Sequence, residues 1–321
     1  MLDVVCFGEI LWDVLETSAR GREPIARTFR RELGGAPANV ATGLARLGVR
    51  SALVGGVGRD RLGEALLEHL KRDRVDVRFV KRFSNRTGLT FVVRDARGEP
   101  EFVFYRHDSA DLAMRPEHVV PAMGRARWVL VGTSTLMTAP LARATHRFLE
   151  VAERAGARVF VDLNVRAHLW DSRAEMQRAI GALAERASLV KASDADLRAV
   201  GGGVRWLERH APRATWLVTR GPREASAIGG HGEVHAPARR VRCVDATGGG
   251  DAFIAGAVAT LVAAGATPGS PAWGNADVWR VALRAGHLMG SKAVSRPGAV
   301  AGLVSLGRVR AMVRAVRSVA P

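Results

Sequence analysis

The sequence Asp245-Ala246-Thr247-Gly248-Gly249-Gly250-Asp251 joins a β-rich segment, residues 232–244, to an almost wholly apolar helix expected from Ala252. Three consecutive glycines let the backbone turn tightly and approach a ligand with no Cβ in the way. Their N–H groups lie at the N-terminus of the following helix, where the helix dipole favours negative charge. A phosphoryl group in transfer needs such an environment, because its transition state spreads negative charge over the equatorial oxygens.

Asp251 falls in the first turn of this helix. A carboxylate there can accept the proton of an alcohol that attacks phosphorus, and a positioned general base contributes roughly 10²–10⁴-fold to a rate. An ordinary glycine-rich turn with an N-capping Asp has the same pattern. The chain contains neither a Walker sequence nor the protein-kinase motifs, so any use of ATP requires another scaffold.

Outward from this stretch, short apolar runs alternate with amphipathic segments. Such alternation predicts a mostly parallel sheet covered by helices on both faces. Residues 14–33 look irregular and polar, and 266–277 read as a loop. The expected strands are 4–7, 51–57, 128–131, 159–162, 189–190 and 216–219, and the expected helices are 36–47, 61–73, 139–155, 172–186, 194–200, 203–210, 278–293 and 305–318.

One segment departs from this rhythm. Residues 89–93 and 102–104 are two alternating apolar runs separated by the turn Asp95-Ala96-Arg97-Gly98, which predicts a hairpin. We therefore expect a single α/β domain over residues 1–321 that carries a small β-lid built from about 14–34 and 85–112. One face of such a lid has no partner in its own chain, which leaves a homodimer through the lid open.

The net charge of +17 comes from 48 basic residues, of which 44 are Arg. The Arg residues are spread along the chain, and their densest runs, 20–31 and 308–317, are short and interrupted. A nucleic-acid module clusters its charge and interleaves aromatic residues along one element. We expect a solvated basic surface and no nucleic-acid partner.

Cys6 and Cys243, the only cysteines, are far apart and give neither a metal-ligand spacing nor a disulfide framework. No basic segment precedes a long apolar core at the start of the sequence, which argues against a signal peptide. The longest apolar stretch, 252–264, is too short to span a bilayer. We expect a soluble, cytoplasmic protein without a membrane partner.

Residues 245–251 followed by Ala252-Phe253 resemble the C-terminal signature of the ribokinase-like (PfkB) carbohydrate kinases. Gly34-Gly35-Ala36-Pro37-Ala38-Asn39-Val40-Ala41 resembles the N-terminal signature of the same family. The resemblance continues through 55–60, 162–166, 218–221 and 295–299, so it covers essentially the whole chain in order. It implies a ribokinase-like α/β/α fold with a β-sheet lid, and transfer of the γ-phosphate of ATP, with Mg²⁺, to a sugar hydroxyl.

The resemblance also assigns roles to residues. It makes Asp251 the catalytic base beside the oxyanion hole of Gly248, Gly249 and Gly250. The sugar would contact Asp13, Asn39, Tyr105, Arg106, Asn164 and Arg166, with Gly34 and Gly35 as the hinge of the lid. The nucleotide would contact Lys191, Ser193, Asp196, Thr219, Gly221, Thr247, Gly248 and Gly250. Asp245 and the backbone carbonyls around Ala293, Arg296 and Gly298 resemble a potassium-binding loop.

Three positions depart from the family pattern. Asp196 stands where a Glu is usual, Glu224 where a Gly is usual, and Gly249 where an Ala is common. The first puts the role of Ser193 and Asp196 in doubt, the second puts the local turn in doubt, and the oxyanion hole should tolerate the third. His287 receives no role.

Within the family the chain most resembles bacterial fructokinases, through Phe7-Gly8-Glu9, residues 34–39, Phe104-Tyr105-Arg106 and Ser109-Ala110-Asp111. The first alternative is a 2-keto-3-deoxygluconate kinase, because Arg106 and Arg166 suit an acidic sugar. Asp111 near the pocket would disfavour a substrate carboxylate and favours a neutral ketose. The second alternative, a catalytically silent sugar-binding relative, does not need the base that Asp251 would supply.

Overall fold

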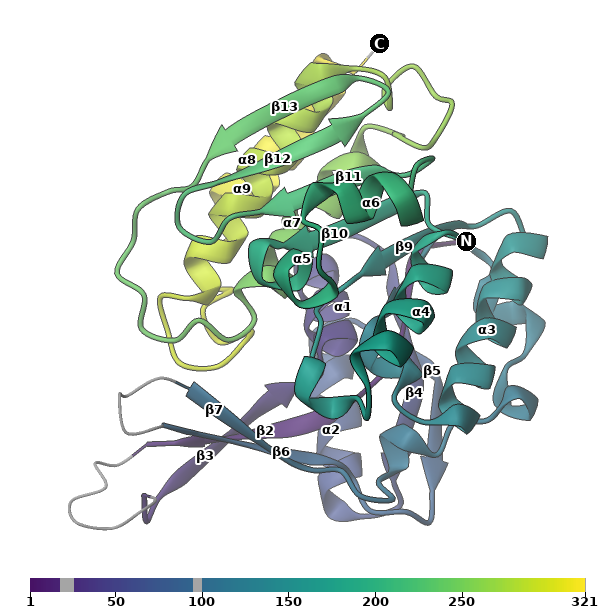
Figure 1. Ribbon diagram of the computed structural model, residues 1–321. Coiled ribbons are helices and arrows are strands. Elements are labelled where there is room, and N and C mark those ends of the chain that lie inside the picture. The colour runs from purple at the N-terminus through teal and green to yellow at the C-terminus, as the bar shows by residue number, and fades with distance from the viewer. Residues whose placement is uncertain (18–25, 95–99, 321) are drawn as a thin grey trace.

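In the computed structural model, which describes residues 1–17, 26–94 and 100–320, two β-sheets and their covering helices account for the fold (Figure 1). Nine described strands form the larger sheet in the order β13-β12-β11-β10-β9-β8-β1-β4-β5. Neighbours are parallel except β11–β12 and β12–β13. The strands are β1 (Leu2–Phe7), β4 (Ser51–Gly58), β5 (Asp76–Phe83), β8 (Ala126–Gly132), β9 (Arg158–Asp162), β10 (Leu189–Ser193), β11 (Thr215–Thr219), β12 (Glu224–Gly229) and β13 (Gly232–Pro237).

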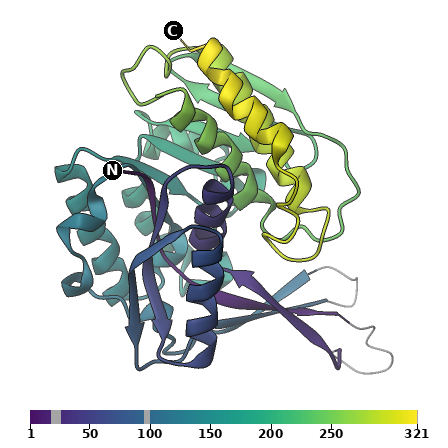
Figure 2. The same cartoon turned by 180° about the vertical axis from the view of Figure 1, so that it is seen from behind.

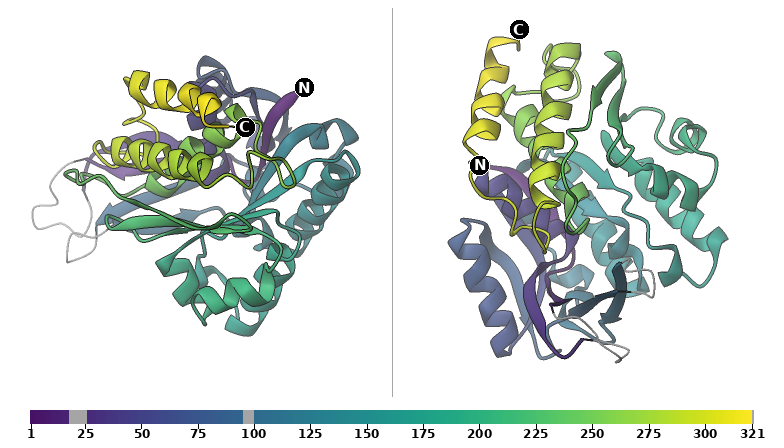
Figure 3. Two further views of the ribbon diagram at one scale, coloured as in Figure 1. Left: turned by 90° about the horizontal axis from the view of Figure 1, so that it is seen from above. Right: turned by 90° about the vertical axis from the view of Figure 1, so that its left-hand side faces the viewer.

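Helices cover both faces of this sheet, as Figure 3 shows from above. Successive side chains of a strand point to opposite faces, so Val4 and Cys6 of β1 pack into one buried cluster and Val5 and Phe7 into the other. The first cluster joins α1 (Ala36–Arg46), α2 (Arg61–Arg72), α7 (Gly249–Ala263), α8 (Ala276–Ala293) and α9 (Gly307–Ala315), which Figure 2 shows from behind. The second joins α3 (Ala139–Arg154), α4 (Arg173–Ala184), α5 (Asp194–Val200) and α6 (Val204–His210).

Local sequence explains where several of these helices begin. Asp60, Thr138 and Ser172 each precede a helix and accept a hydrogen bond from an amide of its first turn, which satisfies a donor that has no intrahelical partner. None of the helices in the described ranges has both the length and the apolar character needed to cross a bilayer. The expected α/β architecture, a mostly parallel central sheet covered by helices on both faces, is confirmed.

The smaller sheet projects from the main body in Figure 1, with strand order β3-β2-β6-β7. Its strands are β2 (Leu11–Glu16), β3 (Phe29–Gly34), β6 (Leu89–Arg94) and β7 (Pro100–Tyr105). The expected hairpin is present as the antiparallel pair β6–β7, while its predicted turn, 95–98, lies outside the described residues. That this sheet acts as a lid stays a prediction.

The expectation of irregular structure over residues 14–33 was wrong for most of its described part. Residues 11–16 pair antiparallel with residues 29–34, and β2 also pairs parallel with β6. The charged run Arg30-Arg31-Glu32 of β3 is solvent-facing or half-buried, so this strand lacks an apolar alternation. The strand conformation of β3 comes from backbone pairing with β2, which no local pattern reveals.

The pattern also failed to indicate β5 and β12. Strand β5 lies at an edge of the large sheet and carries Arg78, Lys81 and Arg82, and charged residues are typical of edge strands. Strand β12 has the sequence Glu-Ala-Ser-Ala-Ile-Gly, poor in the β-branched residues that mark strands. The predicted β-rich segment 232–244 ends at Pro237, because residues 238–244 form no strand.

Helix α7 begins at Gly249, three residues before the expected start at Ala252. Of the three consecutive glycines, only Gly248, the N-cap of the helix, adopts a left-handed conformation, with φ of 73°. A Cβ at Gly248 would lie 2.4 Å from the Cβ of Ala299. Glycine at 248 therefore serves both the turn and the close approach of the 294–299 loop.

Close packing of α7 against α8 yields a first prediction. A Cβ at Gly256 would lie 2.5 Å from the backbone oxygen of Ala285, and backbone atoms cannot move aside as a side chain can. Gly256→Ala should lower the free energy of unfolding by about 1–3 kcal/mol despite the better helix propensity of alanine. Chemical denaturation measures this change.

The matched control is Gly230→Ala, because Gly230 is exposed and nothing lies within 4 Å of an added Cβ. Its stability should stay within about 0.5 kcal/mol of the parent. Equal stabilities for both variants would contradict the described packing of α7 on α8.

Candidate active site

A cavity of about 670 Å³ lies between the small sheet and the carboxyl ends of the parallel strands. Ligands of open parallel sheets bind at this edge. The small sheet contributes side chains of β2, β6 and β7, and the large sheet contributes the segments that follow β1, β8 and β9 and the end of β10. The start of α7 closes the cavity with Gly248, Gly250 and Asp251.

Asp251 is buried in the first turn of α7 and lines the cavity. Its Oδ2 accepts a hydrogen bond of 2.8 Å from Nδ2 of Asn39 on α1, while Oδ1 of Asn39 has no partner among the described residues. Burial raises the pKa of Asp251 to about 7, helped by the nearby Asp162 carboxylate and opposed by Asn39, Lys191 and Arg166. A carboxylate with this pKa suits proton exchange near neutral pH.

Gly249, Gly250 and Asp251 form the first turn of α7, where no intrahelical carbonyl is available to their amides. The amide of Gly249 instead donates to the carbonyl of Ala246 at 3.3 Å. Lys191 on β10 approaches the same turn, with its Nζ 3.4 Å from the place a Cβ at Gly250 would occupy. Lys191 is buried, and its Nζ lies 3.2 Å from Oδ1 of Asp162. Burial alone would lower the pKa of Lys191, but the carboxylates of Asp162 and Asp196 outweigh burial and raise it. The ammonium group therefore stays charged next to the glycine turn.

Asp13 enters the cavity from β2 and lies close to Gly34. A Cβ at Gly34 would lie 2.5 Å from Oδ1 of Asp13, so only glycine leaves room for this carboxylate. Burial raises the pKa of Asp13 to about 8, and the carboxylates of Asp251, Asp245 and Glu9 add to the effect. Asp13 is thus well placed to share protons with hydroxyl groups of a ligand.

Glu9 and Ser134 also line the cavity, although sequence reasoning gave neither a role. Ser134 follows β8, and its Oγ donates a 2.7 Å hydrogen bond to Oε2 of Glu9. Oε1 of Glu9 accepts a hydrogen bond from the backbone amide of Ala36, the residue after Gly35. Gly35 has φ of 94°, a conformation that favours glycine. Only the topology, which places β1 beside β8, brings Glu9 and Ser134 together.

Arg106 follows β7 and lines the cavity, but its charge is already matched. Its Nε donates a 2.8 Å hydrogen bond to Oδ2 of buried Asp111, and Oδ1 of Asp111 accepts from the hydroxyl of Ser109. Asp111 itself is absent from the described lining of the cavity. Arg166, by contrast, donates only to the carbonyls of Asn164 and Val165 among the described residues.

The aromatic residues of β7 lie on both faces of the small sheet. Phe102 and Phe104 line the cavity, whereas Tyr105 points away and remains 64% exposed. Adjacent residues of a strand face opposite sides, so Tyr105 and Phe104 cannot both face the cavity. The structure therefore does not bring Tyr105 to the site and brings the two phenylalanines instead.

The Ser193–Asp196 pair forms a capping box at the start of α5. Asp196 accepts hydrogen bonds from the amide and hydroxyl of Ser193 and from the amide of Val165, each of 2.7 Å. The shorter carboxylate thus joins β10 to the 163–166 loop. Ser193 lines the cavity, but Asp196 is absent from its described lining.

Asp245 ties two loops together. Its Oδ1 accepts from the amide of Thr247 at 2.9 Å and its Oδ2 from the amide of Gly298 at 2.8 Å. The amides of Val244 and Asp245 donate to the carbonyl of Val294. Of the expected potassium-binding residues, Asp245 lies in one loop, Arg296 and Gly298 lie in the adjoining loop, and Ala293 ends α8. All four are outside the described lining of the cavity.

The cavity collects most, but not all, of the residues that sequence reasoning selected. Gly249, Gly34, Thr219 and Gly221 are not among its described lining; Gly249 follows the cap of α7, and Thr219 ends β11, one strand beyond β10. The selected residues that line the cavity are Asp13, Gly35, Asn39, Arg106, Asn164, Arg166, Lys191, Ser193, Thr247, Gly248, Gly250 and Asp251.

Known proteins resemble this chain along most of its length. Fructokinase-1 of Zea mays is 37% identical over 270 residues, which are 81% of this chain and 83% of the relative. A fructokinase of Xylella fastidiosa, solved with bound ATP, superimposes with a TM-score of 0.84 at 29% identity and covers 97% of this chain and 98% of its own. A double mutant of a fructokinase from Vibrio cholerae O395, solved with fructose, ADP and a potassium ion, gives a TM-score of 0.82 at 25% identity over 97% of this chain and 98% of its own.

The family described as pfkB family carbohydrate kinase matches residues 1–305. This match includes both glycine-rich segments and every residue that lines the cavity. The curated relative and the two solved structures carry the name of one enzyme type. The chain belongs to the pfkB family of carbohydrate kinases and is a sugar kinase.

Proposed function

We propose that this kinase transfers the γ-phosphate of ATP to a hydroxyl of D-fructose, with Asp251 as the catalytic base. The observation that carries the proposal is a buried carboxylate, held by Asn39 and placed beside the glycine turn at the start of α7. The fructokinases similar to this chain support fructose as the acceptor. Catalysis of this transfer rests on positioning and electrostatic stabilisation.

In the proposed mechanism Asp251 accepts the hydroxyl proton as the sugar oxygen attacks phosphorus. The amide of Asn39 donates to Oδ2 of Asp251, which orients the carboxylate and leaves Oδ1 toward the acceptor. The developing negative charge on the transferred group is stabilised by the amides of the glycine turn and by the charged Lys191. Because Lys191 lies between Asp162 and Asp196, its position is fixed before a substrate arrives.

Mg²⁺ would enter on the phosphate oxygens of ATP, where it neutralises charge between the phosphates. The donor set supports this indirect mode. No group of three or more His, Cys, Asp or Glu residues in the described parts of the chain could hold a metal ion. Asp196, one of the expected nucleotide-binding residues, already accepts three hydrogen bonds. We therefore assign Ser193 and Asp196 to positioning of the 163–166 loop.

Fructose hydroxyls would bind Asp13 and the unpartnered Oδ1 of Asn39, and Arg166 lines the same cavity. A 2-keto-3-deoxygluconate kinase remains the second candidate because Arg166 has no ion pair among the described residues. The neutral sugar is favoured for two reasons: Asp111 compensates the charge of Arg106, and the acidic residue Glu9 lines the same cavity.

Two further parts of the proposal concern the setting of the enzyme. A cytoplasmic location agrees with the free thiols of Cys6 and Cys243 and with a supply of ATP. A homodimer through the small sheet agrees with the exposure of Val103 and Tyr105 on β7, which leaves apolar surface on the face turned away from the cavity.

Removal of the base should abolish most turnover. Asp251→Asn keeps the shape of the side chain and an acceptor for Asn39, so kcat for fructose should fall by about 10²–10⁴-fold. The assay is ADP release over fructose, 2-keto-3-deoxygluconate, ribose and inosine. The matched control, Asp277→Asn, alters an exposed carboxylate of α8 and should turn over at the parental rate.

A measurement of heat stability distinguishes the loss of the base in Asp251→Asn from unfolding of the variant. Folding raises the pKa of Asp251 to about 7. The free energy of unfolding of the parent therefore falls as the pH rises from the pKa of Asp251 in the unfolded chain through about 7. Asp251→Asn should therefore be at least as heat-stable as the parent at pH 8 or so. Parental activity of Asp251→Asn on fructose would refute the role of Asp251 as the base. A parent protein inactive on all four compounds would favour the catalytically silent sugar-binding relative.

The pH dependence of the parent gives a second prediction. The base must be ionised, and burial raises the pKa of Asp251 to about 7. The kcat/KM for fructose should therefore be level above this value and fall about tenfold per pH unit below it. Direct quantification of ADP over pH 5.5 to 8.5, roughly, measures the profile. A rate that stays level down to about pH 5 would show that an ordinary carboxylate, or none, limits the reaction.

Potassium should activate the enzyme through the loops around Asp245. Each oxygen of Asp245 accepts one hydrogen bond, which leaves lone pairs for a cation, and K⁺ prefers such oxygen ligands. We expect a higher kcat in K⁺ than in Na⁺ at equal ionic strength, and no such difference in Asp245→Asn. Equal rates of the parent in both salts would remove the potassium site from the proposal.

A further inference from the structure

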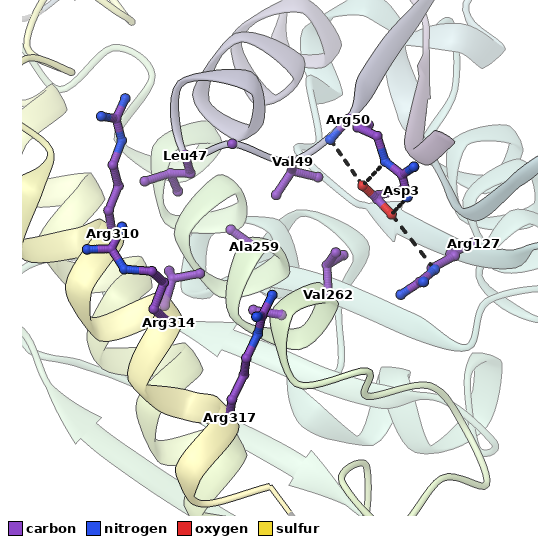
Figure 4. Close-up of a pocket in the computed structure, with 13 residues that line it drawn as sticks. Asp3, Leu47, Val49, Arg50, Arg127, Ala259, Val262, Arg310, Arg314 and Arg317 are labelled. Carbon is purple, nitrogen blue, oxygen red and sulfur yellow. Dashed lines mark hydrogen bonds and ion pairs between the residues drawn. The ribbon is translucent and has the colours of Figure 1, made fainter. Parts of the chain in front are cut away.

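A second cavity, of about 380 Å³, lies at the opposite end of α1 and α7 from the active site (Figure 4). Asn39 and Asp251 mark the beginnings of these two helices at the active site, while Leu47 and Ala263 mark their ends at the second cavity. Helix α9 forms the remaining wall. At 1.5 Å per residue, α7 separates the two sites by roughly 18 Å, so they cannot share a small ligand.

Positive charge dominates this cavity. Five arginines line it, namely Arg50, Arg127, Arg310, Arg314 and Arg317, and Asp3 is the only acidic residue in its described lining. Figure 4 shows Asp3 between Arg50 and Arg127. Arg50 holds Asp3 through two side-chain hydrogen bonds of 2.9 Å, whereas Arg127 lies 3.8 Å from it. One carboxylate is thus already used by one guanidinium group.

The arginines contributed by α9 and the turn after it have different occupations. Arg310 donates to the backbone carbonyl of Arg46 at the end of α1, which is an ordinary helix-capping role. The side chains of Arg314 and Arg317 form no hydrogen bond or ion pair with any described residue, and both residues are exposed. The side chain of Arg317 extends over the cavity in Figure 4. Two guanidinium groups are therefore free to bind an anion.

The surrounding sequence makes this excess of charge difficult to explain as a neutral surface. Residues 278–321 contain seven Arg and one Lys but no Asp or Glu. A preference for Arg over Lys explains which cation is present, yet it does not explain why no acid accompanies it. Like charges held together around a concave surface repel one another, and a bound anion relieves this repulsion.

The floor of the cavity is apolar. Leu47, Val49, Ala259, Val262 and Val313 form it between the arginines, and four of them are buried. A bare inorganic ion leaves such a floor uncovered. A ligand that also has an apolar portion gains contact area there, and guanidinium groups bind phosphate oxygens in pairs.

We propose that this cavity binds a small phosphate monoester whose organic part is apolar. Arg314 and Arg317 contact the phosphate, and the apolar floor lies under the organic part. The volume suits a small molecule. The site is independent of the kinase reaction, because none of its residues lines the active-site cavity.

Titration calorimetry of the full chain with phenyl phosphate tests the proposal. Arg314→Gln/Arg317→Gln should weaken binding by at least about tenfold, because each lost bond is to a charged group. The matched control, Arg284→Gln/Arg308→Gln, removes two exposed arginines of α8 and α9 outside the cavity and should bind as the parent does. Binding at the active site is common to all three proteins and produces no difference.

Two further comparisons sharpen the test. Inorganic phosphate should bind the parent about fivefold to tenfold more weakly than phenyl phosphate, owing to the apolar floor. Arg317→Glu, a single substitution, should weaken phenyl phosphate at least as much as the double variant does. Unchanged kcat and KM for the sugar in every variant would establish that each is folded.

The proposal is overturned if the double variant binds phenyl phosphate as tightly as the parent, or if the control loses as much as the double variant. Equal affinities for inorganic phosphate and phenyl phosphate would refute the apolar part of the ligand. Binding of the parent to phosphatidylglycerol vesicles without binding of phenyl phosphate would assign the surface to a membrane instead. Increasing salt should weaken true binding, because the contacts are ionic.

Discussion

The burial of one carboxylate at the start of α7 constrains the rest of this structure. Asp251 can remain there because Asn39 donates to it and Lys191 lies nearby, and both partners come from elements far away in sequence. The helix itself is encased by α1, α8 and the large sheet. A charge in that position is costly, and the raised pKa of Asp251 expresses this cost. The same cost is what would make the group useful as a base near neutral pH.

The left-handed turn at Gly248 is the second constraint. It sets the direction of α7 and brings the 294–299 loop against the turn. Asp245 then joins this loop to the segment before the turn through two amides. The amides of the glycine turn, the proposed base and the proposed cation loop are therefore parts of one corner of the structure.

Much of the fold could be predicted from the sequence, because the inner parallel strands are buried on both faces and form short apolar runs such as Val4-Val5-Cys6-Phe7. Strands β3, β5 and β12 could not, since charged or small residues fill them and their strand character comes from pairing with neighbours. The apolar pattern predicts the start of α7 at Ala252, and Gly249 and Gly250 before it disfavour a helix. The buried packing of α7 overrides that preference from Gly249 onward.

The candidate site follows a similar division. Motif residues such as Asp13, Asn39 and Asp251 meet in one cavity, because each belongs to a segment with a recognisable turn. Glu9 and Ser134 meet only through the neighbourhood of β1 and β8, which no local pattern contains. Tyr105 could have been separated from Phe104 by strand alternation alone, once β7 was extended to residue 105.

The role of Asp251 is tested most directly by a crystal structure of the protein with fructose and a non-hydrolysable ATP analogue. We expect one fructose hydroxyl within about 2.6–3.2 Å of a carboxylate oxygen of Asp251. This hydroxyl should point toward the terminal phosphate of the ATP analogue. A fructose bound in this cavity with every hydroxyl beyond hydrogen-bonding distance of Asp251 would contradict it.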